Sequence, residues 1–246
     1  MEKIDRYPFF VEPFHVDFNG RMFMSVLGNH LLNAAGNHSQ RRGWGIGALN
    51  EHQHTWVLSR LSIELEEMPY QYEHGEIQTW VENVIRLFTN RNFAILRADG
   101  TPYGYARSTW AMIDVETRKP CDLLTLYDGD ILRYVVPEEE CSCPIAGHGK
   151  FRFKAPKLVR TIETHYSDVD INGHINSIKY IEHILDLFPI ERFREQRLKR
   201  FEIAYKTESY LGDCLSFFVE EADGETDVEV RKDSGEVVCQ AKVQFV

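Results

Sequence analysis

The sequence predicts an α+β protein made of two similar halves, in which each half contains one amphipathic helix and several antiparallel strands. The prediction rests on an internal repeat, on one helix-period apolar stripe after a polar motif, and on alternating segments separated by turn residues. With 246 residues the chain is long enough to bury a large core, as one large domain or two small ones.

The internal repeat is visible when the chain is aligned with itself. Residues 17–22, Asp-Phe-Asn-Gly-Arg-Met, resemble residues 170–175, Asp-Ile-Asn-Gly-His-Ile, at an offset of 153 (170 − 17). The same offset places His30 on His183. Each half is therefore expected to begin with a turn and a helix.

A second match aligns residues 60–65 with residues 200–205 at an offset of 140 (200 − 60). The halves differ at three positions that matter for chemistry: Arg21 stands where the second half has His174, Met68 where it has Glu208, and Pro69 where it has Ser209. A duplicated scaffold would be equally stable with either set, so folding does not explain the difference. The second half is expected to carry the site.

The helix of the second half is predicted from Ile178 onward. Apolar residues follow the spacing of a buried helix stripe and Pro189 ends it; they are Ile181, Ile184, Leu185 and Phe188. Asn176 or Ser177 is the expected N-cap.

The strands are predicted from alternation between turn signals. In the second half they cover 214–221, 226–231 and 236–246, separated by Asp223-Gly224 and by 233–235; in the first half they cover 75–87, 93–97 and 104–115, with breaks near 90–92 and at 99–100. Residues 137–157 mix proline, glycine and an acidic triplet without periodicity and are interpreted as a linker. The expected domains are thus residues 1–136 and 158–246, each a sheet curled around its helix.

The most polar segment of the chain, 168–176, directly precedes the predicted helix. In an extended backbone alternate side chains share one side, and here that side would carry Asp168, Asp170, Asn172, His174 and Asn176. Capping requires only one such residue, so the excess of polar groups favours a functional site. A helix N-terminus also stabilises an oxygen that becomes negative during a reaction.

Composition limits the classes of function. The formal net charge of −10 argues against nucleic acid as a partner. No apolar segment resembles a signal peptide or reaches the roughly 20 residues of a membrane span, so a cytoplasmic protein that does not bind membranes is expected. The five cysteines suit reduced thiols. Cys141, Cys143 and His148 lack further ligands at a convincing spacing, and we expect no metal and no cofactor.

Two basic clusters interrupt the acidic composition. One comprises Arg192, Arg194, Arg197, Lys199 and Arg200; the other comprises Lys150, Arg152, Lys154, Lys157 and Arg160. Each is read either as a solvated surface or as a surface that steers an acidic partner to one place.

Residues 168–182, followed by Phe201-Glu-Ile-Ala-Tyr-Lys-Thr-Glu208-Ser209, resemble the acyl-(acyl carrier protein) thioesterases of plants and bacteria. The first half, with Gly28-Asn-His-Leu-Leu-Asn and Trp110-Ala-Met-Ile-Asp, is similar to the N-terminal repeat of that family. The resemblance implies a tandem (double) hotdog fold. It also implies that Asp170, Asn172, His174 and Glu208 are catalytic. Plant members have a cysteine directly after that glutamate, whereas this chain has Ser209, which excludes a thiol nucleophile there.

The activity that the resemblance implies is hydrolysis of fatty acyl-(acyl carrier protein) to free fatty acid and carrier protein. The site residues leave open whether Asp170 is the nucleophile or an orienting group, and whether the protein is instead an acyl-CoA thioesterase, a hotdog enoyl-thioester hydratase or a non-catalytic acyl-binding module. The first half is expected to bind the acyl chain, with room beside Ala34, Ala35 and Gly36, although close packing also explains small residues there. The chain could also associate as a homodimer.

Overall fold

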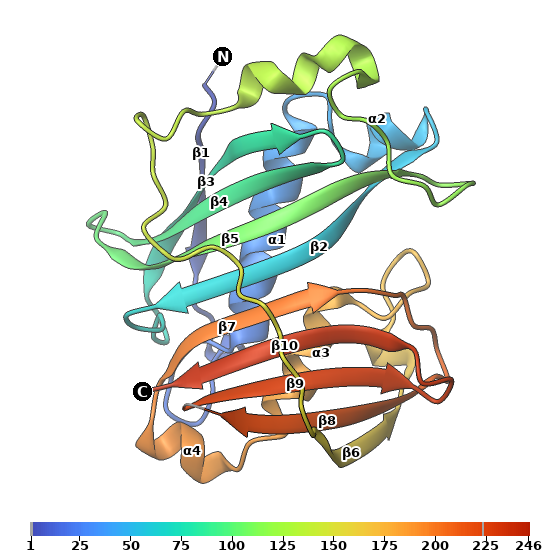
Figure 1. Cartoon of the computed structure of the whole chain (residues 1–246). Coiled ribbons are helices and arrows are strands. Elements are labelled where there is room, and N and C mark those ends of the chain that lie inside the picture. Colours follow the sequence, from blue (N-terminus) through green and yellow to red (C-terminus); the bar gives the residue numbers. More distant parts are fainter. Residues whose placement is uncertain (1, 223) are drawn as a thin grey trace. The chain divides into compact units, whose positions relative to one another are not determined.

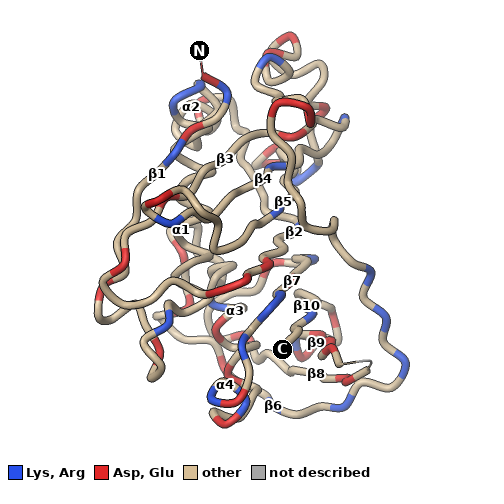
Figure 2. The backbone as a smooth tube through the Cα atoms, turned by 90° about the vertical axis from the view of Figure 1, so that its left-hand side faces the viewer, with Lys and Arg blue, Asp and Glu red and all other residues tan. Residues whose placement is uncertain are grey.

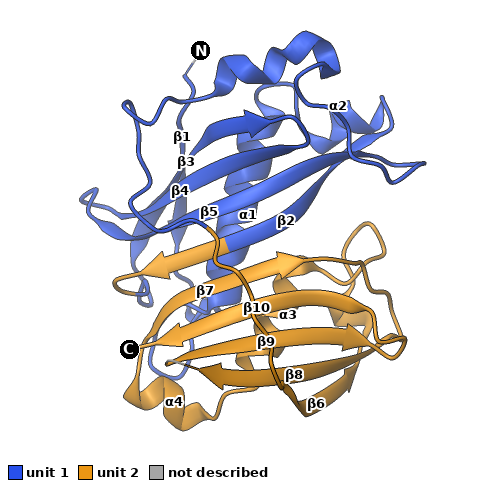
Figure 3. Cartoon of the chain, in the orientation of Figure 1, with its two compact units in different colours: residues 1–61, 68–147 blue, residues 62–67, 148–246 orange. Residues whose placement is uncertain are grey.

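The computed structural model describes residues 2–222 and 224–246, in two compact units (Figures 1 and 3). The first unit comprises residues 1–61 and 68–147, and the second comprises residues 62–67 and 148–246. Among the described residues, none of the helices combines the length and the apolar character that a bilayer span requires.

The N-terminal repeat begins with a strand and a short 3₁₀ turn, continues with two helices and then forms four strands. Its elements are β1 (Asp5–Phe10), η1 (Pro13–His15), α1 (Met24–Gln40), α2 (Ile46–Asn50), β2 (His54–Leu65), β3 (His74–Ile85), β4 (Phe88–Arg97), β5 (Pro102–Asp114) and η2 (Leu126–Tyr134). The strand order is β1-β3-β4-β5-β2.

The C-terminal repeat has the same order of elements in a shorter form. They are β6 (Lys157–Glu163), η3 (Tyr166–Asp168), α3 (Ser177–Leu185), α4 (Ile190–Glu195), β7 (Leu198–Tyr205), β8 (Cys214–Ala222), β9 (Glu225–Lys232) and β10 (Val237–Phe245). The strand order β6-β8-β9-β10-β7 is that of the first repeat, element for element. Within the second unit, residues 62–65 of β2 belong to the strand next to β7.

The register of the first strand pair is also the same in both repeats. Phe10 pairs with His74 between β1 and β3, and Glu163 pairs with Cys214 between β6 and β8. These pairs are related by the offsets of 153 and 140 that the sequence predicts (163 − 10 and 214 − 74). The predicted repeat is therefore confirmed at the level of individual backbone pairs.

Each repeat packs one helix against one face of its own sheet (Figure 1). In α3 the residues Ile178, Ile181 and Ile184 are buried, as the helix-period stripe predicts. The helix ends at Leu185, three residues before the predicted end, and Asn176 is its N-cap because the side-chain oxygen accepts from the N–H of Ile178 at 3.0 Å.

One predicted strand break is wrong. Residues 90–92 lie inside β4, and the chain reverses between Ile85 and Phe88, which pair with each other. Asn90 suits the strand because its amide donates to Asn83 across the hairpin at 3.0 Å and its side-chain oxygen accepts from Thr109 at 2.7 Å. Asn90 thus forms cross-strand hydrogen bonds and does not mark a turn.

The predicted turn at 233–235 joins β9 and β10, with Gly235 at a φ of 83°. Of the predicted Asp223-Gly224 turn, Asp223 lies outside the described residues, while Gly224 has a φ of 79°. Both glycines occupy the left-handed region that other residues rarely adopt.

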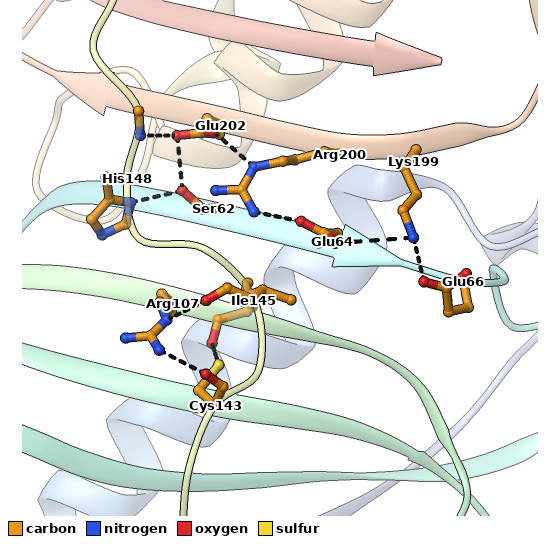
Figure 4. Close-up of polar contacts among 12 residues, drawn as sticks. Ser62, Glu64, Glu66, Arg107, Cys143, Ile145, His148, Lys199, Arg200 and Glu202 are labelled. Carbon is orange, nitrogen blue, oxygen red and sulfur yellow. Dashed lines mark hydrogen bonds and ion pairs between the residues drawn. The ribbon is translucent and has the colours of Figure 1, made fainter. Parts of the chain in front are cut away.

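Most of the predicted linker has no regular secondary structure: no helix or strand covers residues 136–156. Its first part is held in the first unit by Arg107, which donates to the carbonyl oxygens of Cys143 and Ile145 (Figure 4). Its second part is held in the second unit because Gly149 N donates to Glu202 at 2.7 Å and Lys154 N donates to Glu220 at 2.8 Å. Carboxylates of the sheet thus satisfy backbone donors of this segment.

Candidate active site

The Asp-Ile-Asn-Gly-His motif forms a tight turn before α3, so the predicted extended segment with five polar residues on one side is wrong. The carbonyl of Asp170 accepts from Gly173 N at 3.1 Å, and Asp170 N donates to the carbonyl of His174 at 2.8 Å. Gly173 has a φ of 81°, which permits the reversal. As a result Asp168 is buried, whereas Asn172 is exposed.

The Asp170 carboxylate stabilises this turn. Its Oδ1 accepts from the backbone N–H groups of Asn172 and His174 at 2.8 and 3.2 Å, and its Oδ2 lies 3.5 Å from the amide nitrogen of Asn172. One carboxylate oxygen is therefore fully used by the backbone, while the other faces the side chain of Asn172.

His174 and Glu208 come together from different elements. Nδ1 of His174, at the end of the turn, lies 3.5 Å from Oε1 of Glu208, which follows β7. The two side chains are 25% and 32% exposed, so water and a substrate can reach them. The Tyr210 ring packs edge-on to the imidazole, and its hydroxyl donates to Oε2 of Glu208 at 3.4 Å. The four predicted residues thus form two pairs, Asp170 with Asn172 and His174 with Glu208, joined by the backbone of one turn.

Ser209, next to Glu208, is fully buried. Its hydroxyl forms a short hydrogen bond with the hydroxyl of Tyr180 on α3, and its carbonyl accepts from Ile175 N at 2.9 Å. Burial raises the pKa of Tyr180, which keeps its hydroxyl protonated as a hydrogen-bond partner. A buried hydroxyl without a neighbouring base is not available as a nucleophile.

Comparison with known proteins identifies the family. The family model described as "Acyl-ACP thioesterase N-terminal domain" matches residues 4–127, and the one described as "Acyl-ACP thioesterase C-terminal domain" matches residues 154–246, where ACP is acyl carrier protein. The chain belongs to the acyl-ACP thioesterase family.

Among solved structures, an acyl-ACP thioesterase from Bacteroides thetaiotaomicron is 57% identical, with a TM-score of 0.93 over 99% of this chain and 98% of that chain. The 12:0-ACP thioesterase from Umbellularia californica superposes with a TM-score of 0.84 over 100% of this chain and 98% of that chain, at 18% identity, which supports the fold alone. The expected double hotdog fold is confirmed.

Among curated proteins, the chloroplastic oleoyl-acyl carrier protein thioesterase 2 of Arabidopsis thaliana is 26% identical over 221 residues. The match covers 84% of this chain and 60% of that protein. The chain therefore spans about three fifths of the length of the curated acyl-ACP thioesterases that it matches.

In the basic cluster 192–200, the three cations nearest its C-terminal end are held by neighbouring groups of the second unit. Arg200 pairs with Glu64 and Glu202 at 2.6 and 2.8 Å, and Lys199 pairs with Glu66 (Figure 4). Arg197 donates to the carbonyl of Leu65 at 3.1 Å. Glu64, Glu66 and Glu202 thus neutralise the charges of Lys199 and Arg200, which weakens the interpretation of this part of the cluster as a steering surface.

The second basic cluster has a different environment. We call residues 148–160 the basic strap (Figure 2). Its five cationic residues are all exposed; they are Lys150, Arg152, Lys154, Lys157 and Arg160. Within residues 2–222 and 224–246, none of these five side chains forms an ion pair; Arg160 donates to the carbonyl of Asp186 at 3.4 Å. The strap therefore presents exposed positive charge that no ion pair among the described residues neutralises.

A serine, a histidine and an acid also meet away from the candidate site (Figure 4). Ser62 Oγ lies 2.7 Å from Nδ1 of His148 and donates to Glu202 at 3.3 Å. In a catalytic triad the acid orients the histidine, whereas here it contacts the serine, and Ser62 is fully buried. Burial by itself raises the pKa of Glu202, but hydrogen bonds from Gly149 N–H and Arg200 outweigh it and hold the pKa below its usual range. This cluster is structural.

Sequence reasoning missed four residues around the candidate site: Asp168 as a hydrogen-bond partner, Tyr180, His183 and Tyr210. Nε2 of His183 lies 2.9 Å from Oδ1 of the buried Asp168. The i, i+3 spacing of Tyr180 and His183 on the predicted helix was the available signal, because such residues share a face. Among the described residues, no three His, Cys, Asp or Glu side chains gather as metal ligands.

Proposed function

We propose that the chain hydrolyses fatty acyl-ACP to free fatty acid and ACP, with Asp170, Asn172, His174 and Glu208 as the catalytic residues. The observation that carries the proposal is the approach of His174 to Glu208, at 3.5 Å, directly beside the N-terminus of α3. Membership of the acyl-ACP thioesterase family supports the substrate class.

In the proposed mechanism Glu208 is the general base for water, and His174 positions that water. The water oxygen bonds to the thioester carbon while its proton moves to Glu208. The carbonyl oxygen becomes negative and is stabilised by the partial positive charge at the N-terminus of α3. The carbon–sulfur bond then breaks and the thiolate of the carrier takes up the proton from Glu208.

Asp170 acts as the orienting group in this proposal rather than as the nucleophile. Its Oδ1 already accepts two backbone hydrogen bonds, which stabilise the carboxylate and reduce its nucleophilicity. Asn172 is exposed beside it and can donate its amide to the thioester carbonyl. Asp170 thus stabilises the turn that carries His174 and Asn172.

We further propose that the basic strap receives the carrier protein, because ACP is acidic and the strap carries exposed cations that form no ion pair within the described part of the chain. In the cluster 192–200, by contrast, Lys199 and Arg200 are paired with carboxylates. The acyl chain is assigned to the N-terminal repeat, where Ala34 and Ala35 are buried in α1; Gly36 is exposed and takes no part. The domain boundaries, a homodimer and a cytoplasmic location stay predictions.

The test is release of thiol from a saturated acyl-ACP. Wild-type protein is expected to turn over, and Glu208→Gln and His174→Asn are each expected to lower kcat on the order of a hundredfold or more. Near-normal rates in both variants would overturn the site assignment. Stoichiometric binding without turnover would identify a binding module, and hydration of an enoyl-ACP without thiol release would identify a hydratase.

A further inference from the structure

Helix α3 contacts both segments that carry the candidate catalytic residues. Tyr180 bonds to Ser209, the residue after Glu208, and His183 bonds to Asp168, two residues before Asp170. We call these contacts the Tyr180 clamp and the His183 clamp. Because residues three apart lie on one face of a helix, a single face of α3 makes both contacts.

The backbone around the clamps is the same in both repeats. Ile175 N donates to the carbonyl of Ser209 at 2.9 Å, and in the N-terminal repeat Met22 N donates to the carbonyl of Pro69 at 2.8 Å. These pairs are related by the offsets of 153 and 140. The turn, the start of the helix and the segment after the strand thus have one common frame in both repeats.

A second backbone contact is also shared. Asn176 N donates to the carbonyl of Asp168 at 2.8 Å, as Phe23 N donates to that of His15 at 2.9 Å. In each repeat, two backbone hydrogen bonds thus hold the start of the helix to the neighbouring segments.

The side chains of the clamps are not shared. The N-terminal repeat has the buried Leu27 where α3 has Tyr180, and Pro69 where the C-terminal repeat has Ser209, so no such hydrogen bond can form. His15 and His30 take the places of Asp168 and His183, and their rings pack edge-on with centroids 6.2 Å apart. The fold therefore forms this frame without either clamp.

The clamps occur in the repeat that holds the candidate catalytic groups. We propose that Tyr180 with Ser209, and His183 with Asp168, are positioning residues for the proposed thioester hydrolysis: the first pair fixes Glu208 and the second fixes the turn that carries His174. The inference rests on the proposed function. Ser209 and Asp168 are both buried, so each clamp holds its segment where the surrounding side chains leave little freedom.

Small displacements matter here because the catalytic pair is already at 3.5 Å. A misplacement of about 1 Å can cost on the order of a hundredfold in rate. Loss of one clamp is therefore expected to reduce kcat without removing a group that contacts the substrate.

The experiment compares kcat and KM for Tyr180→Phe, Ser209→Ala, the double variant and His183→Leu. Each single change is expected to lower kcat about tenfold with KM within about twofold, and the Tyr180/Ser209 double variant should equal its singles because both remove one bond. His183→Gln keeps a donor near the Nε2 position and is expected to recover most of the rate. The matched control is His30→Leu, the equivalent change in the N-terminal repeat, which is expected to leave kcat unchanged.

Crystal structures of Tyr180→Phe and His183→Leu give a readout that does not depend on activity. The distance from Nδ1 of His174 to Oε1 of Glu208 is expected to exceed the 3.5 Å of the parent and to be kept in His30→Leu. If the wild type is active and both variants keep its kcat and its His174–Glu208 distance, the positioning role of the clamps is overturned and the proposed function is not. An inactive wild type would overturn the proposed function, while the distances would still decide the positioning role.

Discussion

Asp17 and Asp170 hold the same turn in the two repeats. Oδ1 of Asp17 accepts from Asn19 N at 2.7 Å and from Arg21 N at 3.1 Å, and Oδ1 of Asp170 accepts from the equivalent N–H groups at 2.8 and 3.2 Å. Only the second turn ends in a histidine that faces an acid. The two aspartates therefore separate the structural role of the turn from its proposed chemical role.

Asp170→Asn is expected to keep the turn, because an amide oxygen still accepts both backbone hydrogen bonds, and to lower kcat on the order of a hundredfold through loss of the charge. Steady-state rates with acyl-ACP measure the effect. Asp17→Asn is the matched control and should leave kcat unchanged. Equal activity of the two variants would contradict the orienting role of Asp170.

The ion pair between Asp5 and Arg42 predicts a pH-dependent contribution to stability. The hydrogen bond from Arg42 lowers the pKa of Asp5 from 3.8 to about 2, although burial opposes this shift, and both side chains are nearly inaccessible. Since the folded-state pKa is lower than the unfolded one, the contribution is complete above about pH 4 and is lost as the pH falls toward 2. Asp5→Asn should reduce the free energy of unfolding at pH 7 on the order of 2 kcal/mol.

Urea titrations of wild type and Asp5→Asn at several pH values measure this difference. It should shrink below pH 4. The pair of the half-buried Asp130 with the exposed Arg133 gives a control whose removal costs less than about 1 kcal/mol. A difference that stays constant down to pH 2 would show that charge is not its source.

Glu202 joins the basic strap to the sheet. Glu202→Leu would leave Gly149 N–H without its acceptor and Arg200 with one carboxylate fewer, so we expect a loss of about 3 kcal/mol in the free energy of unfolding. Glu66→Ala removes an exposed partner of Lys199 and should cost less than about 1 kcal/mol. Similar losses for the two variants would mean that Glu202 contributes no more than an exposed charge.

The basic strap makes the carrier proposal testable with charge reversals. The triple variant Lys150→Glu, Lys154→Glu, Lys157→Glu is expected to lower kcat/KM for acyl-ACP about tenfold at low salt, and less at high salt because salt screens exposed charges. Rates with acyl-pantetheine, which lacks the acidic protein, should not change. Arg194→Glu is the control from the other cluster; a larger effect of that single change would place the carrier there.

Much of the fold was predictable because short sequence motifs occur in both repeats and determine their local structure. The Asp-x-Asn-Gly motif requires one residue with positive φ and one side-chain acceptor, so the same turn recurs at Gly20 and Gly173. The approach of His174 to Glu208 was also expected, from the resemblance rather than from spacing.

Other features depend on partners far away in sequence and could not be read locally. The charges of Arg200 and Lys199 are neutralised by Glu64 of β2 and by Glu66 directly after it, more than a hundred positions earlier. Tyr180 likewise meets Ser209 only after the chain has formed β7. The prediction that residues 168–176 are extended was wrong because the Asp170 carboxylate accepts a backbone hydrogen bond from Asn172 and so stabilises a turn.

The replacement of His174 by Arg21 in the N-terminal repeat has a consequence for stoichiometry. A symmetric pair of identical subunits would offer two equivalent reactive centres, whereas the site proposed for this tandem chain occurs once, in the C-terminal repeat. A tight transition-state analogue should therefore saturate at one molecule per polypeptide. The turn of the N-terminal repeat then has to keep its shape but needs no reactive side chain.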